Sequence, residues 1–123
     1  MALDPTEAYF AYSAAWNEGT NSAAREKLLE SAWASDGEFF DEDTPEGLTG
    51  VQALSTYIAE THEQMPNLVI SETADPVLLG NRLRVPWLAR QGDTVMFTGT
   101  DFVEFAADGR VSRVTMFYDS TPD

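Results

Sequence analysis

The longest alternating stretch of the sequence, Thr94 to Phe105, predicts a core strand that carries one carboxylate on its buried side. Side chains two residues apart point to the same side of a strand. The apolar side of this strand comprises Val95, Phe97, Gly99, Asp101, Val103 and Phe105. Burying an ionised carboxylate without a partner is costly. Asp101 is therefore expected to be paired, protonated or part of a functional site.

The remaining pattern predicts an α+β protein in which helices pack on one face of a curved sheet. Tyr9, Tyr12 and Trp16 recur at helical spacing and mark the buried side of the first helix. Two further helices are expected over about 22–34 and 51–65. Strands are expected over 38–41, 68–74, 82–90, 94–105 and 110–118, with an acidic loop over 42–50. Pro86 within a strand pattern indicates an edge or a bulge.

Composition narrows the classes of function. The 123 residues fit a single domain, residues 1–123, and carry 21 acidic against 7 basic side chains, a net charge of −14. Such a surface repels phosphates and anionic lipids, so neither a nucleic-acid nor a membrane partner is expected. The chain has no cysteine, and neither a signal-peptide pattern nor a membrane-spanning run is recognisable. The cytoplasm is the expected location.

Asp101 is the first candidate for chemistry. Burial raises the pKa of a carboxylic acid, and a neutral acid can donate a hydrogen bond to a developing oxyanion. The alternative is a structural role, with Asp101 accepting hydrogen bonds from Arg82, Arg84 or a backbone amide.

Two more polar residues lie on faces otherwise occupied by aromatic side chains. Tyr12 is a candidate second oxyanion donor, or an ordinary core residue. Asp41 ends a short strand and is a candidate general base, or part of a solvated acidic loop with Glu42 and Asp43. Asp41, Asp101 and Tyr12 together predict a catalytic acid/base pocket.

The pocket is expected to be mainly apolar and to lie between the helices and the sheet. The candidate ligand-binding residues are Trp16, Phe39, Ile58, His62, Trp87, Phe97 and Phe117. His62 is the only histidine, so the usual multi-histidine zinc or iron site is not expected. We expect no metal and no cofactor, and a small hydrophobic molecule as the ligand.

Eight segments carry a resemblance to a known family. They are Ala15-Trp16-Asn17, Arg25 to Leu29, Asp36 to Asp41, Leu48-Thr49-Gly50, Val85-Pro86-Trp87, Gly99 to Phe102, Asp108 to Val111 and Phe117-Tyr118-Asp119. With these segments the chain, from about Ala8 to Asp119, resembles the SnoaL-like and ketosteroid-isomerase-like branch of the nuclear transport factor 2-like superfamily. The resemblance implies a cone-shaped, cystatin-like α+β fold, with three N-terminal helices on a curved antiparallel sheet. We also expect a homodimer through the outer face of that sheet.

Ketosteroid isomerases use a helix tyrosine, an aspartate base and a protonated aspartic acid. The resemblance implies these roles for Tyr12, Asp41 and Asp101, although Asp41 is followed by Glu42 rather than the common proline. The expected function is a small cofactor-independent enzyme that moves a proton next to a carbonyl. The alternatives are a non-catalytic binder of a hydrophobic ligand, a hydrolase that activates water with Asp101 and Arg84, and, less favoured, a protein-interaction scaffold.

Overall fold

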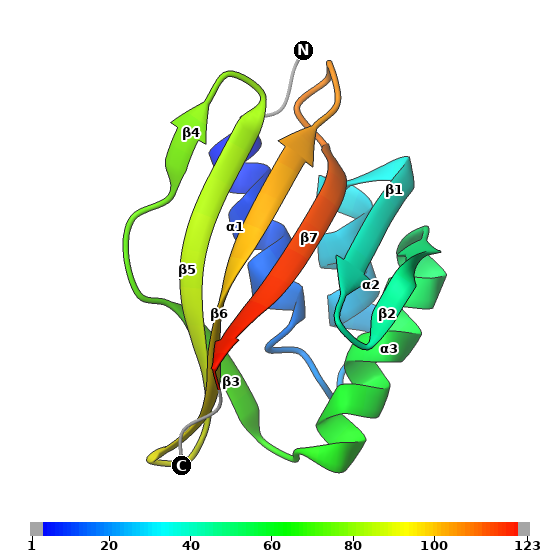
Figure 1. Ribbon diagram of the computed structural model, residues 1–123. Coiled ribbons are helices and arrows are strands. Elements are labelled where there is room, and N and C mark those ends of the chain that lie inside the picture. Colours follow the sequence, from blue (N-terminus) through cyan, green and yellow to red (C-terminus); the bar gives the residue numbers. More distant parts are fainter. Residues whose placement is uncertain (1–3, 121–123) are drawn as a thin grey trace.

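Three helices pack on the concave face of a curved sheet in the computed structural model, which describes residues 4–120 (Figure 1). The helices are α1 (Pro5–Ala15), α2 (Ser22–Ala32) and α3 (Val51–Gln64). The strands are β1 (Trp33–Asp41), β2 (Thr44–Thr49), β3 (Leu68–Glu72), β4 (Val77–Leu79), β5 (Arg82–Gln91), β6 (Thr94–Phe105) and β7 (Val111–Ser120). The predicted α+β class is confirmed.

The strands follow the order β2-β1-β7-β6-β5-β3, and β4 also pairs with β5. All pairings are antiparallel except that of β1 with β7, which is parallel. The prediction of an antiparallel sheet is therefore wrong for the pairing of β1 with β7. A parallel pair needs a long crossover, and here the intervening chain forms α3 and the rest of the sheet. The helices are accordingly not all N-terminal, because α3 follows the β1–β2 hairpin.

The acidic segment after Asp41 is a strand rather than the expected loop. Residues 44–49 form β2 and pair with β1, which itself begins at Trp33, where the predicted second helix was expected to continue. Gly47 has a φ of 86°, and a side chain there would overlap the ring of Phe40. Pro45 and this glycine are typical of loops, which is why the sequence pattern concealed the strand.

Pro86 lies where the outer edge of β5 changes partner. Glu72 of β3 is opposite Trp87, whereas Val77 of β4 is opposite Arg84. Proline has no N–H with which to continue a ladder, and its carbonyl accepts a hydrogen bond from the Thr73 amide. The prediction of an edge or a bulge is met only locally: β5 is an interior strand, and Pro86 falls in the gap between its two outer partners.

The buried side of β6 follows the expected alternation from Gly99 to Phe105, with Asp101 among the buried side chains. Val95 is the exception and is 37% exposed. The register between β5 and β6 shifts at Ala89/Arg90, so Val95 lies beyond an irregularity and leaves the inner face.

The outer face of the sheet exposes an aromatic pair. Phe102 and Phe117 are 46% and 50% exposed, and their rings meet edge to face at 5.7 Å. The homodimer through this face stays a prediction, as does the cytoplasmic location. Within residues 4–120, no helix has the length and apolar character needed to cross a membrane.

Candidate functional site

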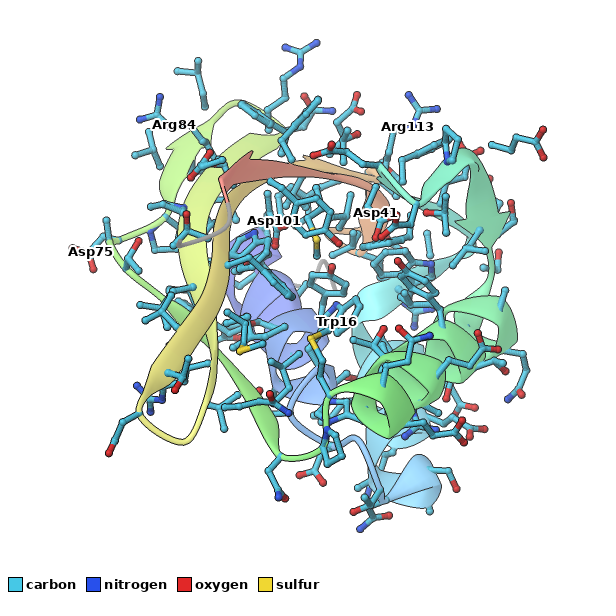
Figure 2. All side chains as sticks on the ribbon, turned by 60° about the horizontal axis from the view of Figure 1, so that its bottom comes forward. Trp16, Asp41, Asp75, Arg84, Asp101 and Arg113 are labelled. Carbon is cyan, nitrogen blue, oxygen red and sulfur yellow. The ribbon has the colours of Figure 1, made fainter. Side chains whose placement is uncertain are left out.

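A pocket of about 450 Å³ opens between α3, the residue that follows α1 and the concave face of the sheet. Its volume is in the range of small-molecule sites. Figure 2 looks toward this end of the molecule, with Trp16 between the helices and the arch of the sheet. The lining residues are Trp16, Asp43, Tyr57, Glu60, Thr61, Gln64, Met65, Leu68, Ile70, Trp87, Phe97, Met116 and Tyr118.

Three aromatic rings from neighbouring strands form one wall, which we call the aromatic corner: Trp87 of β5, Phe97 of β6 and Tyr118 of β7. The Trp87 ring is 5.9 Å from Phe97 and 6.2 Å from Tyr118, at interplanar angles of 87° and 77°. Phe97 and Tyr118 are 5.5 Å apart at 80°. The three planes are thus nearly perpendicular to one another. Gly99 makes room for this arrangement, because a Cβ there would overlap the Trp87 indole and the Phe117 carbonyl.

The opposite wall is formed by Trp16 and Tyr57, whose rings are 6.1 Å apart at 86°. Phe39 packs behind both, at 5.9 Å and 5.7 Å between ring centroids. Phe39 is itself fully buried and does not line the pocket. This wall is thus backed by the core, to which Trp87 of the aromatic corner also belongs.

Asp101 is buried on β6 with only one hydrogen bond. The Tyr9 hydroxyl donates to its Oδ2 at 3.0 Å, while Oδ1 has no partner among the described residues. Burial raises the pKa of Asp101 to about 7; the Tyr9 hydroxyl and the nearby Trp87 indole N–H oppose this rise, and the charge of Glu72 adds to it. The Trp87 N–H also lacks a partner of hydrogen-bond geometry within residues 4–120. Asp101 can therefore change protonation state near neutral pH.

Neither arginine considered as a partner reaches Asp101. Arg82 and Arg84 are exposed, and Arg84 points outward from the sheet, away from Asp101 (Figure 2). On β5, inward side chains alternate with outward ones, and both arginines occupy outward positions. The hydrolase alternative, which needed Arg84 beside Asp101, is therefore wrong in its geometry.

Tyr12 does not donate to Asp101. Its hydroxyl accepts a hydrogen bond from Trp16 Nε1 at 3.0 Å, and its ring stacks on Trp33 at 5.3 Å. Tyr12 is 1% exposed and does not line the pocket. The donor to Asp101 is Tyr9, almost one helical turn earlier, which the sequence analysis placed on the same stripe without assigning it a role.

Asp41 is buried and fully engaged in the turn between β1 and β2. Its Oδ1 accepts from the amides of Asp43 and Thr44 at 3.0 Å and 2.8 Å, and from the Thr44 hydroxyl at 2.8 Å. Its Oδ2 accepts from the Tyr57 hydroxyl at 2.6 Å. An aspartate that bonds its own following amides is a turn-forming residue. The acidic residue of this turn that lines the pocket is Asp43.

The seven candidate ligand-binding residues separate into two groups. Trp16, Trp87 and Phe97 line the pocket. Phe39, Ile58, His62 and Phe117 do not line it. Phe39 and Ile58 are fully buried, and Nε2 of His62 lies 2.6 Å from the Trp16 carbonyl oxygen, a contact that holds the end of α1 against α3.

Phe117 lies on the opposite face of the sheet from the pocket. Alternation counted from Val111 would place it inside. The register between β6 and β7 shifts instead, because Glu104 is opposite Arg113 and Phe105 is opposite Val111. The extra residue on β7, Ser112, reverses the alternation, so Tyr118 points inward.

Ten of the thirteen lining residues were not among the expected ligand-binding residues, and Tyr57 and Asp43 are two of them. Tyr57 lies beside the apolar stripe of α3 rather than on it, and its only sequence signal is its spacing of three from Leu54. Within residues 4–120, no cluster of three or more histidine and carboxylate side chains is arranged to hold a metal ion.

The sequence matches no family model and no curated protein. Solved structures do match. A candidate isomerase of the SnoaL-like family from Agrobacterium tumefaciens is 27% identical, with a TM-score of 0.84 over 93% of this chain and 96% of that one. A candidate ketosteroid isomerase from Kribbella flavida is 21% identical, with a TM-score of 0.72 over 97% and 80% of the two chains.

A third structure, from Catenulispora acidiphila, is a protein with a ketosteroid isomerase-like fold in complex with trimethylamine. It is 21% identical, with a TM-score of 0.72 over 94% of this chain and 87% of that one. The first structure confirms the predicted resemblance to SnoaL-like proteins. The two ketosteroid isomerase-like structures, at lower identity, show that this protein shares their α+β cone fold.

Proposed function

We propose that this protein binds a small, largely apolar molecule in the pocket and transfers a proton to or from it, with Asp101 as the proton-exchanging group. The observation that carries the proposal is a buried acid with an unpartnered oxygen and a pKa near 7 beside an aromatic pocket. A pKa close to the working pH is the property that general acid–base catalysis favours.

Asp101 lies behind the lining of the pocket rather than on it. Its cross-strand neighbour on β7 is Met116, which lines the pocket. Methionine is unbranched and adapts its shape readily. Displacement of the Met116 side chain by a ligand would therefore expose Asp101 Oδ1 without moving a strand.

The chemistry requires no cofactor. A protonated Asp101, held by the Tyr9 hydroxyl, would pass its proton to a carbonyl oxygen as the adjacent carbon loses its proton, and would take it back when the enol collapses to the conjugated ketone. Asp41 is unsuited to accept that proton, because its oxygens already accept four hydrogen bonds. Asp43, on the pocket wall, takes the role of base in this proposal.

The candidate isomerase of the SnoaL-like family supports this reaction class, since it matches nearly the whole chain. The more distant structures support the fold alone. A second candidate function is binding without turnover. It is favoured by the finding that Asp41, Asp101 and Tyr12 all lie outside the lining of the pocket.

The test is the conversion of a β,γ-unsaturated cyclic ketone to its conjugated isomer, followed by ultraviolet absorbance. We expect Asp101→Asn to lower the rate by about 100-fold or more, the usual contribution of a general acid or base. Asp75→Asn is the matched control, because Asp75 is exposed and points away from the pocket (Figure 2).

Conversion at an equal rate in the Asp101→Asn variant would overturn the role of Asp101. No conversion by the wild-type protein, together with tight binding of a naphthol in its neutral form, would establish the binding function instead. A naphthol bound as its anion, and weakened by Asp101→Asn, supports the acid/base function.

A further inference from the structure

The pocket walls are chemically suited to a positive charge. The face of an aromatic ring carries the negative end of its quadrupole, and several ring faces around one point attract a cation. The aromatic corner brings three ring planes together at nearly right angles. Trp16 and Tyr57 provide two further rings on the opposite wall.

The charged residues that line the pocket are both acidic. Asp43 and Glu60 line the pocket, and no lysine, arginine or histidine is among the lining residues. Asp43 and Glu60 are both exposed at the rim of the pocket, where a carboxylate attracts a cation without being buried. The net charge of −14 adds a long-range attraction of the same sign.

The acidic turn between β1 and β2 is fixed beside the aromatic corner. Glu42 Oε2 accepts a hydrogen bond from the Tyr118 amide at 3.2 Å, and Asp41 holds the Tyr57 hydroxyl. Burial raises the pKa of the Tyr118 hydroxyl above its usual range, and the charges of Asp41, Asp43 and Glu42 raise it further. The hydroxyl that faces this turn therefore lies in a negative field.

On the basis of the pocket function proposed above, we propose that the ligand carries a positive charge: an alkylammonium or arylammonium group, held in the aromatic corner with Asp43 and Glu60 at the rim. The apolar remainder of the molecule would lie along Leu68, Ile70 and Met65, which line the rest of the pocket. Proton exchange with Asp101 then concerns the part of the ligand nearest to Met116.

The test compares choline with its neutral tert-butyl analogue, which has nearly the same shape and no charge. Dissociation constants are measured by quenching of tryptophan fluorescence and by calorimetry. We expect choline to bind about tenfold more tightly, in line with a cation–π contribution of about 1–2 kcal/mol. Equal or tighter binding of the neutral analogue would overturn the proposal.

Two sets of variants, each with a matched control, locate the charge. Phe97→Leu and Tyr118→Leu should each weaken choline several-fold, whereas Phe102→Leu, on the outer face of β6, should not. Asp43→Asn should weaken choline at low salt more than at high salt, while Asp75→Asn should have no effect. Circular dichroism confirms that each variant is folded. Unchanged affinity in both folded aromatic variants would contradict the assigned position.

The two proposals fail separately. Conversion of the neutral ketone with no preference for choline would remove the cationic ligand and leave the acid/base function. A strong preference for choline, with an Asp101→Asn variant that behaves like the wild type in the ketone assay, would remove the acid/base function and leave the cation site.

Discussion

Asp41 and Asp101 are buried to nearly the same degree, at 5% and 4% exposure, yet their surroundings differ sharply. Asp41 accepts four hydrogen bonds, three of them from the residues that follow it in a tight turn. Asp101 accepts one, from Tyr9, and its second oxygen has no partner within residues 4–120. The number of donors, rather than depth, distinguishes the two: Asp41 is held in a turn, whereas Asp101 keeps an unpartnered oxygen among the described residues, which is why we propose it as the reactive group.

The largest expected effect is on the pH dependence of stability. In the unfolded chain Asp101 ionises near its ordinary pKa of 3.8, and in the folded chain near 7. Between these values the folded state holds one more proton, so Asp101 lowers the free energy of unfolding as pH rises through this window. The free energy of unfolding falls by at most about 1.4 kcal/mol per pH unit, and this decrease levels off above pH 7.

Asp101→Asn should therefore be more stable than the wild type at pH 8 by roughly 2–4 kcal/mol and nearly equal to it at pH 4. Urea unfolding at the two pH values measures this difference. Asp75→Asn, an exposed site, should show no such change. A constant difference between Asp101→Asn and the wild type across this range would contradict a proton held by Asp101.

A smaller effect is expected at the other carboxylate. Asp41→Ala removes the acceptor of four hydrogen bonds and should lower the free energy of unfolding by about 2 kcal/mol. Asp41→Asn should cost less, because the amide oxygen still accepts from Asp43 and Thr44. Urea unfolding gives the loss, and faster hydrogen exchange at the Thr44 amide would assign it to the turn. Equal stability of the alanine variant would show that the turn forms without Asp41.

The smallest effects are expected from replacing either of two tyrosines of α1, Tyr9 or Tyr12, by phenylalanine. Tyr9→Phe removes the one hydrogen bond that Asp101 accepts within residues 4–120 and should move the pKa of that carboxyl further upward, by up to about one unit. Tyr12→Phe leaves Trp16 Nε1 without a partner and should cost about 1 kcal/mol with no change in the titration of Asp101. Carbon NMR of the carboxyl groups follows the titration. The same shift in both variants would mean that Tyr9 does not act through its hydroxyl.

Periodicity was sufficient to predict the buried side of β6 from Gly99 to Phe105, where the strand is regular, but not at Val95, beyond the register shift. It also placed Tyr9 and Tyr12 on one side of α1. Which of them meets Asp101 depends on how the helix is turned against the sheet, and no local pattern contains that angle. Phe117 shows a second limit of the sequence pattern, since one extra residue at Ser112 reverses the alternation of β7 from Arg113 to Tyr118.

The β1–β2 hairpin could not be predicted for a different reason. Its residues are acidic and contain a proline and a glycine, so their own preferences favour a loop. They form a strand because β1 finds a partner in β7, far along the sequence. The pocket residues Asp43 and Tyr118 come together only through that pairing.

The parallel pairing of β1 with β7 also sets the order in which the molecule can form. A chain made from its N-terminus produces α1, α2 and β1 early, but β1 lacks its parallel neighbour until residues 111–120 exist. Pairings between distant segments form slowly, because a long loop has to close first. Met116 and Tyr118, two residues that line the pocket, lie on that strand. During synthesis the pocket is therefore completed late, after most of its other residues have already been made.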